Sequence, residues 1–599
     1  MDPIKVDFTG KGANRKKEII IPPEKAGVKT VICVLGTLVL GALYYYLMLP
    51  PMNPKAMEFY MFFGAIFATY VGLTVVVTKA MAKPEYIPYV KKQAIIPGVA
   101  IGVLALVVAV GFVVSSPFFR AKSYSQIIEV NDNGNFTEEI DRQDAKSYSN
   151  IPRLDEAAAA NIASRALSDL EKIGKVSQFT VYPLYTQINY KNNPVRVATL
   201  QYANIIKWFT NRVEGLPGYT IINMADQTTD FIELKELGQE PIRYSPADHF
   251  GRLLKRHLRF KYPTLIFDEP TFEIDDEGTP YWICAVLDKT IGLFGGPDVK
   301  GAVLVKSNDI KGACQYYSLD ELKDKPEIQW IDRIFSSELL VEQYNYYGKY
   351  QNGFWNSILG QKAVFITTEG FNYIAKDDDV FMYTGVTSVT SDQSITGFVL
   401  INQRTKAATF YRVSGAKEQS AMSVAEGKVK DKAYVASFPL LINVSGQPPY
   451  FMALKDNDQI NQQFAMVNVR NFNKLFVVGD DLANCLDQYN KLLKTEGIMV
   501  DIDVSDIVQP DNGDVNQETD KIVTVTGAVA EIRTAVIGGE SWYYIRLANE
   551  DVFYSIAASK ASDAIIMNAN DNITITFTVV EGSAKIIKAD LVSLVQIVE

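Results

Sequence analysis

Three long apolar runs occupy the first fifth of the chain. Thr30–Leu49 and Phe59–Thr78 each contain 20 residues without a charged side chain, and Gln93–Phe119 contains 27. A helix needs about 20 apolar residues to cross the hydrocarbon core of a bilayer. The apolar core of a signal peptide is shorter, about 7–15 residues, and is not followed by two further spans. The pattern therefore predicts three transmembrane helices in contact with the membrane lipid bilayer.

Basic residues around these runs predict their orientation, because cytoplasmic loops are enriched in Lys and Arg. Seven precede the first run, one lies in the first loop and four lie in the second: Lys5, Lys11, Arg15, Lys16, Lys17, Lys25, Lys29, then Lys55, then Lys79, Lys83, Lys91 and Lys92. We expect residues 1–29 in the cytoplasm and residues 120–599 outside it, at the plasma membrane. Arg120 and Lys122 oppose this count, and the opposite orientation would make residues 120–599 cytoplasmic. No ionisable residue interrupts the runs, so they are typical of an anchor rather than a transport pathway.

Behind the spans, the apolar pattern alternates between helical and strand periods. Asp155–Ile173 repeats apolar residues at three-to-four spacing and predicts a helix, as do 204–213 and Ala247–Lys261. From about Thr271 the chain reads as β hairpins, with a long helix at about 328–350. We therefore expect a mixed α+β domain at 120–265 and repeated β-hairpin and helix modules at 266–500.

Two pairs of similar segments suggest that these modules are duplicated. Ile274–Trp282 resembles 442–451, each with a strand end, an Asx/Gly turn and an aromatic strand after proline. Gly301–Val305 resembles Gly397–Ile401, each followed by a polar turn and an aromatic strand. Serial α+β modules explain both pairs; chance similarity between hairpins is the alternative.

The last hundred residues have a different pattern. Residues 501–520 are acidic, carry Pro510 and Gly513 and lack periodicity, so they read as a linker. Five strand-like runs follow between 521 and 592, with a short predicted helix at Ala561–Asn568 between the third and fourth. This order is typical of an OB-like β-barrel.

Composition and charge narrow the classes of function. At 599 residues the chain is too long for one hydrophobic core, so several domains are expected. Residues 120–599 carry 47 basic and 63 acidic residues. Such an acidic exterior argues against nucleic acid as a partner, which requires a basic footprint. Cys284, Cys314 and Cys485 cannot all pair within the chain, and a single Cys284–Cys314 bridge is left open.

Motifs that carry catalysis or bind metals are not found in the sequence. It contains no G-x-S-x-G, H-E-x-x-H, Walker A or G-x-G-x-x-G pattern, and its two histidines, His249 and His257, are eight residues apart. Acidic clusters at Asp268-Glu269, 275–277 and 377–379 suit solvated turns, with calcium binding or paired carboxylates as alternatives. We expect no cofactor, no metal and no catalytic residue, and a protein that is not an enzyme.

Two patches are candidate interaction sites. Arg252, Lys255, Arg256, Arg259 and Lys261 form a dense basic patch that could meet lipid headgroups or an anionic wall polymer; a solvated helix face is the alternative. The second patch is aromatic and suits sugar or peptide binding, with a buried helix corner as the alternative. Its residues are Tyr344, Tyr346, Tyr347, Tyr350, Phe354 and Trp355.

Four stretches resemble an uncharacterised family of membrane-anchored proteins from Gram-positive gut bacteria. They are Asp268–Trp282, Ile291–Gly296, Glu342–Gln361 and Asp377–Thr405. The resemblance implies an anchored envelope protein and carries no activity. The strand–turn–strand pairs are also similar to PepSY modules, which implies inhibitory or regulatory domains.

Together these features favour a non-enzymatic, membrane-anchored protein of the cell envelope. Its extracytoplasmic portion would serve in assembly or partner binding, with other envelope proteins or a second copy of itself as partner. One alternative is an accessory subunit of a membrane transport or secretion complex. Another is a membrane-bound wall-polymer hydrolase that uses carboxylates such as Glu269 and Asp275.

Overall fold

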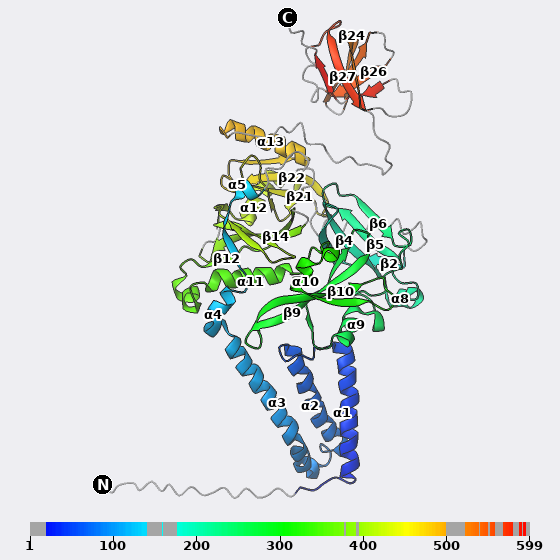
Figure 1. Ribbon diagram of the computed structural model, residues 1–599, viewed down its shortest axis with the longest axis vertical. Helices are drawn as coiled ribbons and strands as arrows, with labels where there is room; N and C mark the ends of the chain where they lie inside the picture. The colour runs from blue at the N-terminus through cyan, green and yellow to red at the C-terminus, as the bar shows by residue number, and fades with distance from the viewer. Residues whose placement is uncertain are drawn as a thin grey trace, which may run out of the picture. The chain divides into compact units, whose positions relative to one another are not determined.

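The computed structural model in Figure 1 divides the chain into two compact units, residues 1–512 and 513–599. Each unit is described by itself. The described residues are 20–140, 152, 159, 177–376, 379–390, 394–498, 522–537, 540–548, 552–557, 567–578, 586–589 and 591–594. The predicted linker at 501–520 lies outside them, as do nearly all of the predicted helices Asp155–Ile173 and Ala561–Asn568.

The three predicted spans are confirmed as helices that are long and apolar enough to cross a membrane. They are α1 (Ala26–Met48), α2 (Met57–Thr78) and α3 (Ile87–Ser115), the last preceded by the 3-10 turn η1 (Pro84–Tyr86). α2 packs between the other two, and Figure 1 shows the three as a stem beneath the rest of the first unit.

The third span ends four residues before its charge-free run does, at Ser115 rather than Phe119. Ser116 has extended backbone, and its Oγ accepts a hydrogen bond from the Phe118 amide, so it caps a separate helix, α4 (Pro117–Ser125). Pro117 stands at the first position of α4, where its missing N–H costs nothing. The chain therefore turns at Ser116, and Phe118 and Phe119 belong to α4 rather than to the span.

Four sheets in the described part of residues 126–498, which we call the body, share one plan. In each, two short strands pair with the same long strand, and two further antiparallel strands complete a half-barrel. The first sheet is β2 (Phe179–Val181), β3 (Thr186–Tyr190), β4 (Asn193–Tyr202), β5 (Gly218–Asn223) and β6 (Thr229–Glu233). The second is β7 (Ile266–Phe267), β8 (Thr271–Ile274), β9 (Pro280–Ile291), β10 (Gly295–Lys306) and β11 (Cys314–Ser318).

The last two sheets of the body repeat the plan. The third is β12 (Phe365–Thr367), β13 (Asn372–Lys376), β14 (Asp379–Ser388), β16 (Gly397–Asn402) and β17 (Ala408–Tyr411). The fourth is β19 (Val435–Ala436), β20 (Leu440–Leu441), β21 (Pro449–Lys455), β22 (Asn461–Asn468) and β23 (Phe476–Gly479). β1 (Val130–Gly134) joins the third sheet, parallel to β17, although the sequence places it in the 120–265 domain. β15 (Ser394–Ile395) and β18 (Gly415–Ala416) form a small separate pair.

The sheets pack in series because their inner strands are apolar on both faces. Alternate residues of a strand point to opposite faces. Accordingly, Trp282 and Cys284 of β9 lie in the core shared with the first sheet, whereas Ile283 and Ala285 lie in the core shared with the third. Phe398 and Leu400 of β16 likewise face the fourth sheet. Continuous apolar runs are typical of strands buried on both sides.

Both pairs of similar segments occupy equivalent positions in this plan. Ile274–Trp282 is the end of β8, its turn and the start of β9, and 442–451 is the turn between β20 and β21 with the start of β21. Gly301–Val305 lies in β10 and Gly397–Ile401 in β16, each the middle strand of its sheet. Common topology therefore supports serial modules over chance similarity.

Helices connect the sheets and cover their edges. They are α5 (Phe136–Glu139), α8 (Ile205–Asn211), η3 (Phe250–Arg252), α9 (Leu254–Lys261), α10 (Leu319–Asp324), η4 (Pro326–Ile328), α11 (Ser337–Tyr350), η5 (Asn356–Gly360), α12 (Glu418–Lys428), η6 (Lys430–Lys432) and α13 (Leu482–Thr495).

Two of these helices begin later than their apolar patterns predict. α9 begins at Leu254 rather than Ala247, because His249 and Leu253 have non-helical backbone. α11 begins at Ser337 rather than near 328. The amides of Asp332 and Arg333 are instead held by the buried carboxylate of Glu273, at 2.9 and 3.1 Å.

The second unit is a single six-stranded sheet in its described part. Its strands are β24 (Ile522–Ile537), β25 (Glu540–Leu547), β26 (Phe553–Ala557), β27 (Asn572–Thr578), β28 (Ile586–Lys588) and β29 (Leu591–Leu594). β24 pairs with both β25 and β27, β26 pairs in parallel with β28, and β27 pairs with β29. The five predicted strand runs are all present, the last one as β28 and β29.

Candidate functional site

The predicted basic patch lies against the end of the first span rather than on an open surface. Arg259 is 4% exposed and Arg256 is 9% exposed. Nε of Arg259 donates to the carbonyl of Leu49 at 3.0 Å, and its Nη1 donates to three more carbonyls, of Tyr262, Pro263 and Leu265. The last carbonyls of a helix lack intrahelical partners. The α9 guanidinium groups supply those partners at the end of α1.

Arg256 makes the second half of this contact. Its Nε and Nη2 donate to the carbonyl of Tyr46 at 3.3 and 3.2 Å, and its guanidinium carbon lies 4.1 Å from the centre of the Tyr46 ring. A cation near a helix C-terminus also meets the negative end of the helix dipole. Lys255 is exposed, and Lys261 donates to the carbonyl of Cys314. The structure therefore assigns the buried arginines to joining body and anchor, not to an anionic surface.

A β hairpin makes a further joint with the third span. The turn between β9 and β10 is Gly292–Phe294, and the amides of Leu293 and Phe294 donate to Ser115 Oγ at 2.9 and 3.0 Å. The Phe294 ring packs between Tyr60 of α2 and Phe112 of α3. Ile291–Gly296, one of the stretches that carry the family resemblance, is thus the body's contact with the spans.

The first loop completes the connection. Met52 N–H donates to Pro263 O at 2.8 Å, and Lys55 forms an ion pair with Asp288 at 2.8 Å. The body therefore lies on the side of the spans that holds the first loop. We call Arg256, Arg259, Ser115, Phe294 and Lys55, with these partners, the anchor joint.

The predicted aromatic patch divides into buried and exposed parts. Tyr344 is buried in the core between the second and third sheets, and Tyr346 and Tyr350 pack on Tyr124 of α4. Phe354 and Trp355 lie beyond the end of α11, and Trp355 is 62% exposed. The structure thus separates a helix that packs on α4 from an exposed aromatic tip.

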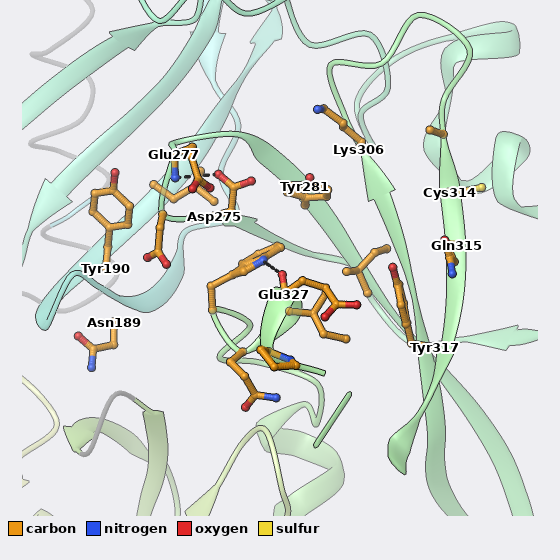
Figure 2. Close-up of a pocket in the computed structure, with 18 residues that line it drawn as sticks. Asn189, Tyr190, Asp275, Glu277, Tyr281, Lys306, Cys314, Gln315, Tyr317 and Glu327 are labelled. Atoms are coloured by element: carbon orange, nitrogen blue, oxygen red, sulfur yellow. Dashed lines mark hydrogen bonds between the residues drawn. The ribbon is translucent and has the colours of Figure 1, made fainter. Parts of the chain in front are cut away.

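A pocket of about 730 Å³ lies between the first and second sheets. Figure 2 shows Tyr190 and the turn at Asp275 on one side, Tyr317 on the other, and Tyr281 between them. The remaining lining residues are Asn189, Ile274, Asp276, Glu277, Leu304, Lys306, Ala313, Cys314, Gln315, Pro326, Glu327, Ile328, Gln329 and Trp330.

The chemistry of this pocket is acidic and aromatic. Four carboxylates line it (Asp275, Asp276, Glu277 and Glu327) against one cation, Lys306. The pKa of Tyr281 is raised to about 12, mainly because the side chain is partly buried and secondly because Asp275 is negatively charged. Such walls suit a positively charged group, which is attracted both by carboxylates and by the faces of aromatic rings.

Two rings of the pocket already have a lysine over them. Nζ of Lys191 lies 4.8 Å from the centre of the Tyr190 ring, and Nζ of Lys325 lies 5.0 Å from that of Tyr317. The pKa of Lys191 is raised, chiefly by Tyr190 and more weakly by Asp276 and Glu277. The chain's own lysines therefore show that ammonium groups fit against these walls.

The carboxylate pair considered for hydrolysis does not share a cleft. Asp275 lines the acidic pocket, whereas Glu269 lines a separate pocket beside α9. Oδ1 of Asp275 accepts from the amides of Glu277 and Thr279, at 3.1 and 2.7 Å, so it braces the β8–β9 turn. The most deeply buried carboxylate nearby, Glu273, has its pKa raised by burial and is hydrogen-bonded to backbone amides. Asp275 and Glu273 therefore hold backbone amides of the turn and of the segment before α11.

Both histidines and Asp379 also have structural partners, whereas Asp377 and Asp378 of the third acidic cluster lie outside the described residues. His257 contacts the carbonyl of Gly312 at 2.8 Å and packs on Tyr244, while His249 precedes η3. Asp379 pairs with Arg404 at 2.6 Å. Within the described residues no cluster of His, Cys, Asp and Glu suits a metal ion, and the four cysteines are free thiols, so the structure has no Cys284–Cys314 bridge.

Sequence reasoning missed the anchor joint and the acidic pocket. The Ile-Gly-Leu-Phe-Gly-Gly turn was a usable signal, because apolar residues at the tip of a hairpin need an apolar partner. The pocket had no such signal, since its walls come from β3, the β8–β9 turn, β11 and η4, which only folding brings together. Comparisons of the chain with protein-family models, with curated proteins and with solved structures found no match.

Proposed function

We propose that this chain is a non-enzymatic, membrane-anchored protein of the cell envelope that holds a partner-binding body at a fixed position over the membrane. The observation that carries the proposal is the anchor joint. Its buried arginines, its ion pair and its inserted hairpin connect all three spans to the body. If the spans were only a flexible tether, none of these contacts would be needed. The contacts therefore support a function that depends on the position of the body over the membrane.

The extracytoplasmic side is proposed for the body. The side away from the body holds Lys79 and Lys83 of the loop between α2 and α3, and Lys91 and Lys92 near the start of α3, which favours the cytoplasm. On the body side, the lysine of the first loop is neutralised by Asp288.

The acidic pocket is the proposed partner site, and its chemistry favours a partner segment rich in Lys or Arg. Asp276 and Glu277 are exposed at its rim, and Trp330 and Tyr281 pack together inside, with ring centres 4.9 Å apart. Rim carboxylates steer a cationic segment towards the pocket, and the rings then hold it.

Removing the rim charges is expected to weaken binding of a cationic peptide. The test uses the full chain in phosphatidylcholine nanodiscs with a tetralysine peptide, and a tetraglutamate peptide as reverse-charge control. Because exposed charges contribute about 0.2–1 kcal/mol each, Asp276→Asn/Glu277→Gln should raise the dissociation constant about two- to thirtyfold. The matched control Asp431→Asn/Glu496→Gln removes two exposed carboxylates elsewhere on the body. It should leave the dissociation constant of the tetralysine peptide unchanged. Equal affinity for wild type and rim variant would reject the pocket as the site.

An OB-like barrel is proposed for the second unit. In support, β28 pairs with β26 and β29 pairs with β27, and only two residues separate β28 from β29. One continuous run thus reaches both edges of the sheet, as closure of a small barrel requires. Membership of the Gram-positive family and similarity to PepSY modules are likewise proposals, which rest on the sequence stretches quoted above.

A second candidate function is an accessory subunit of a membrane complex. Gly98 and Gly102 lie one turn apart on α3 with open space beyond them, whereas Gly36 and Gly41 pack against side chains of α2. Small residues let a partner helix approach closely. Copurification of a polytopic partner that is lost in a Gly98→Leu/Gly102→Leu variant would favour this function over the first.

A further inference from the structure

We propose that the tip beyond α11, residues 354–359, and the first residues of α4, Phe118 and Phe119, form a second membrane contact. They would lie in the interfacial region of the leaflet that faces the body and rest one flank of the body on lipid. We call these residues the interfacial tip.

The interfacial tip is assembled from two distant segments by ring contacts. The Phe118 ring centre lies 5.2 Å from that of Phe354 and 5.7 Å from that of Trp355. Phe118 follows the end of α3 by only three residues. Figure 1 accordingly shows α4 at the body-side end of α3, beside the end of α11.

Large apolar side chains of the interfacial tip are unusually exposed. Phe119 is 63% exposed, Trp355 is 62% exposed and Leu359 is 76% exposed, with Phe118 and Ile358 close to half exposed. Contiguous exposed apolar groups mark a contact with a membrane or another protein. The segment that exposes these side chains has a defined conformation. The Asn356 side chain accepts a hydrogen bond from the amide of Lys362 and donates one to its carbonyl.

Continuity with the lipid-facing surface of α3 identifies lipid as the occupant. Phe112, Val113 and Val114 of α3 are 53%, 56% and 42% exposed, and they lead directly into Phe118 and Phe119. A bilayer that surrounds the end of α3 would therefore continue onto the interfacial tip. The tip is helical, but the backbone leaves the helical conformation beside it, at Ser116 and at Gly353 with φ +83°, which is tolerated at the headgroup level but not in the hydrocarbon core.

Charge around the interfacial tip agrees with this depth. Residues 117–122 and 349–362 contain four basic side chains and no acidic one: Arg120, Lys122, Lys349 and Lys362. Interfacial segments combine apolar and basic residues in this way, because the basic groups meet anionic headgroups. The contact also explains why Arg120 and Lys122 depart from the positive-inside pattern.

Fluorescence of Trp355 tests the contact directly. The full chain is placed in nanodiscs whose lipids carry bromine on the upper acyl chain, and the Trp355→Phe spectrum is subtracted from that of wild type to isolate Trp355. We expect brominated lipid to reduce this difference signal by at least half, with little quenching by iodide. Strong iodide quenching without quenching by brominated lipid would overturn the proposal.

A charge variant provides the second measurement. Trp355 in an Ile358→Glu/Leu359→Glu background should lose at least half of its quenching by brominated lipid. Val435 lies on the fourth sheet and is 51% exposed, so the control variant Val435→Glu should not change the quenching of Trp355 by brominated lipid. If Trp355 is shielded from iodide in native membranes but not in lipid nanodiscs, a protein covers the tip and the lipid contact is rejected.

Discussion

Arg259→Met is expected to destabilise the protein by roughly 3–5 kcal/mol, because it removes the guanidinium donors of the Leu49 and Leu265 carbonyls and two further hydrogen bonds, to Tyr262 and Pro263. Methionine keeps much of the side-chain volume, so the change tests the guanidinium rather than packing. Arg259→Lys should not restore the loss, since a single ammonium group cannot reach Leu49 and Leu265 together. Thermal unfolding of the detergent-solubilised chain, followed by tryptophan fluorescence, measures the effect.

The matched control for Arg259 lies on the same helix. Lys255 is exposed on α9, so Lys255→Met should change stability by less than about 0.5 kcal/mol. Limited proteolysis adds a second readout, because loss of the joint should expose the Pro50–Lys55 loop. Equal unfolding temperatures for Arg259→Met and Lys255→Met would show that the basic patch does not hold the body to the anchor.

Gly111→Val is expected to cost about 1–3 kcal/mol by forcing Phe294 out of its site between α2 and α3. A Cβ at Gly111 would lie 2.6 Å from Cε2 of Phe294, closer than two carbon atoms can approach. Gly102→Val makes the same change on the same helix, where nothing lies within 4 Å. It should therefore have a much smaller effect on thermal unfolding.

A double-mutant cycle separates this clash from a general effect on the span. Phe294→Ala removes the ring that Gly111→Val would strike, so the double variant should lose less stability than the two single variants combined. Residues in direct contact show such coupling, by about 0.5–3 kcal/mol. Strict additivity of the two changes would mean that the β9–β10 turn does not pack on Gly111.

The parts of the fold that the sequence predicts are those set by local pattern. Charge-free runs located the spans because no soluble helix tolerates 20 apolar residues on every side. Alternation and turn residues located the hairpins, and the Ile274–Trp282 and Gly301–Val305 similarities reflect a real topological repeat. Each of these signals is contained in a short segment, about the 11–18 residues over which periodicity is read.

The parts that the sequence does not predict depend on distant contacts. Charge-free composition extended the third span to Phe119, but the span ends at Ser115, because the Ser116 side chain caps the separate helix α4. Arg256 and Arg259 looked like a solvated face because their partners, Tyr46 and Leu49, lie 210 residues earlier. β1 joined the third sheet for the same reason, through pairing with Ala408–Tyr411.

The central claim is that the body stands outside the cytoplasm on a three-helix anchor. Protease treatment of intact protoplasts, probed with an antibody against residues 521–599 and with a tag at residue 1, tests it most directly. We predict that the C-terminal epitope is lost from intact protoplasts while the N-terminal tag survives until lysis. Survival of the C-terminal epitope until lysis, with loss of the tag beforehand, would place the body in the cytoplasm and contradict the account.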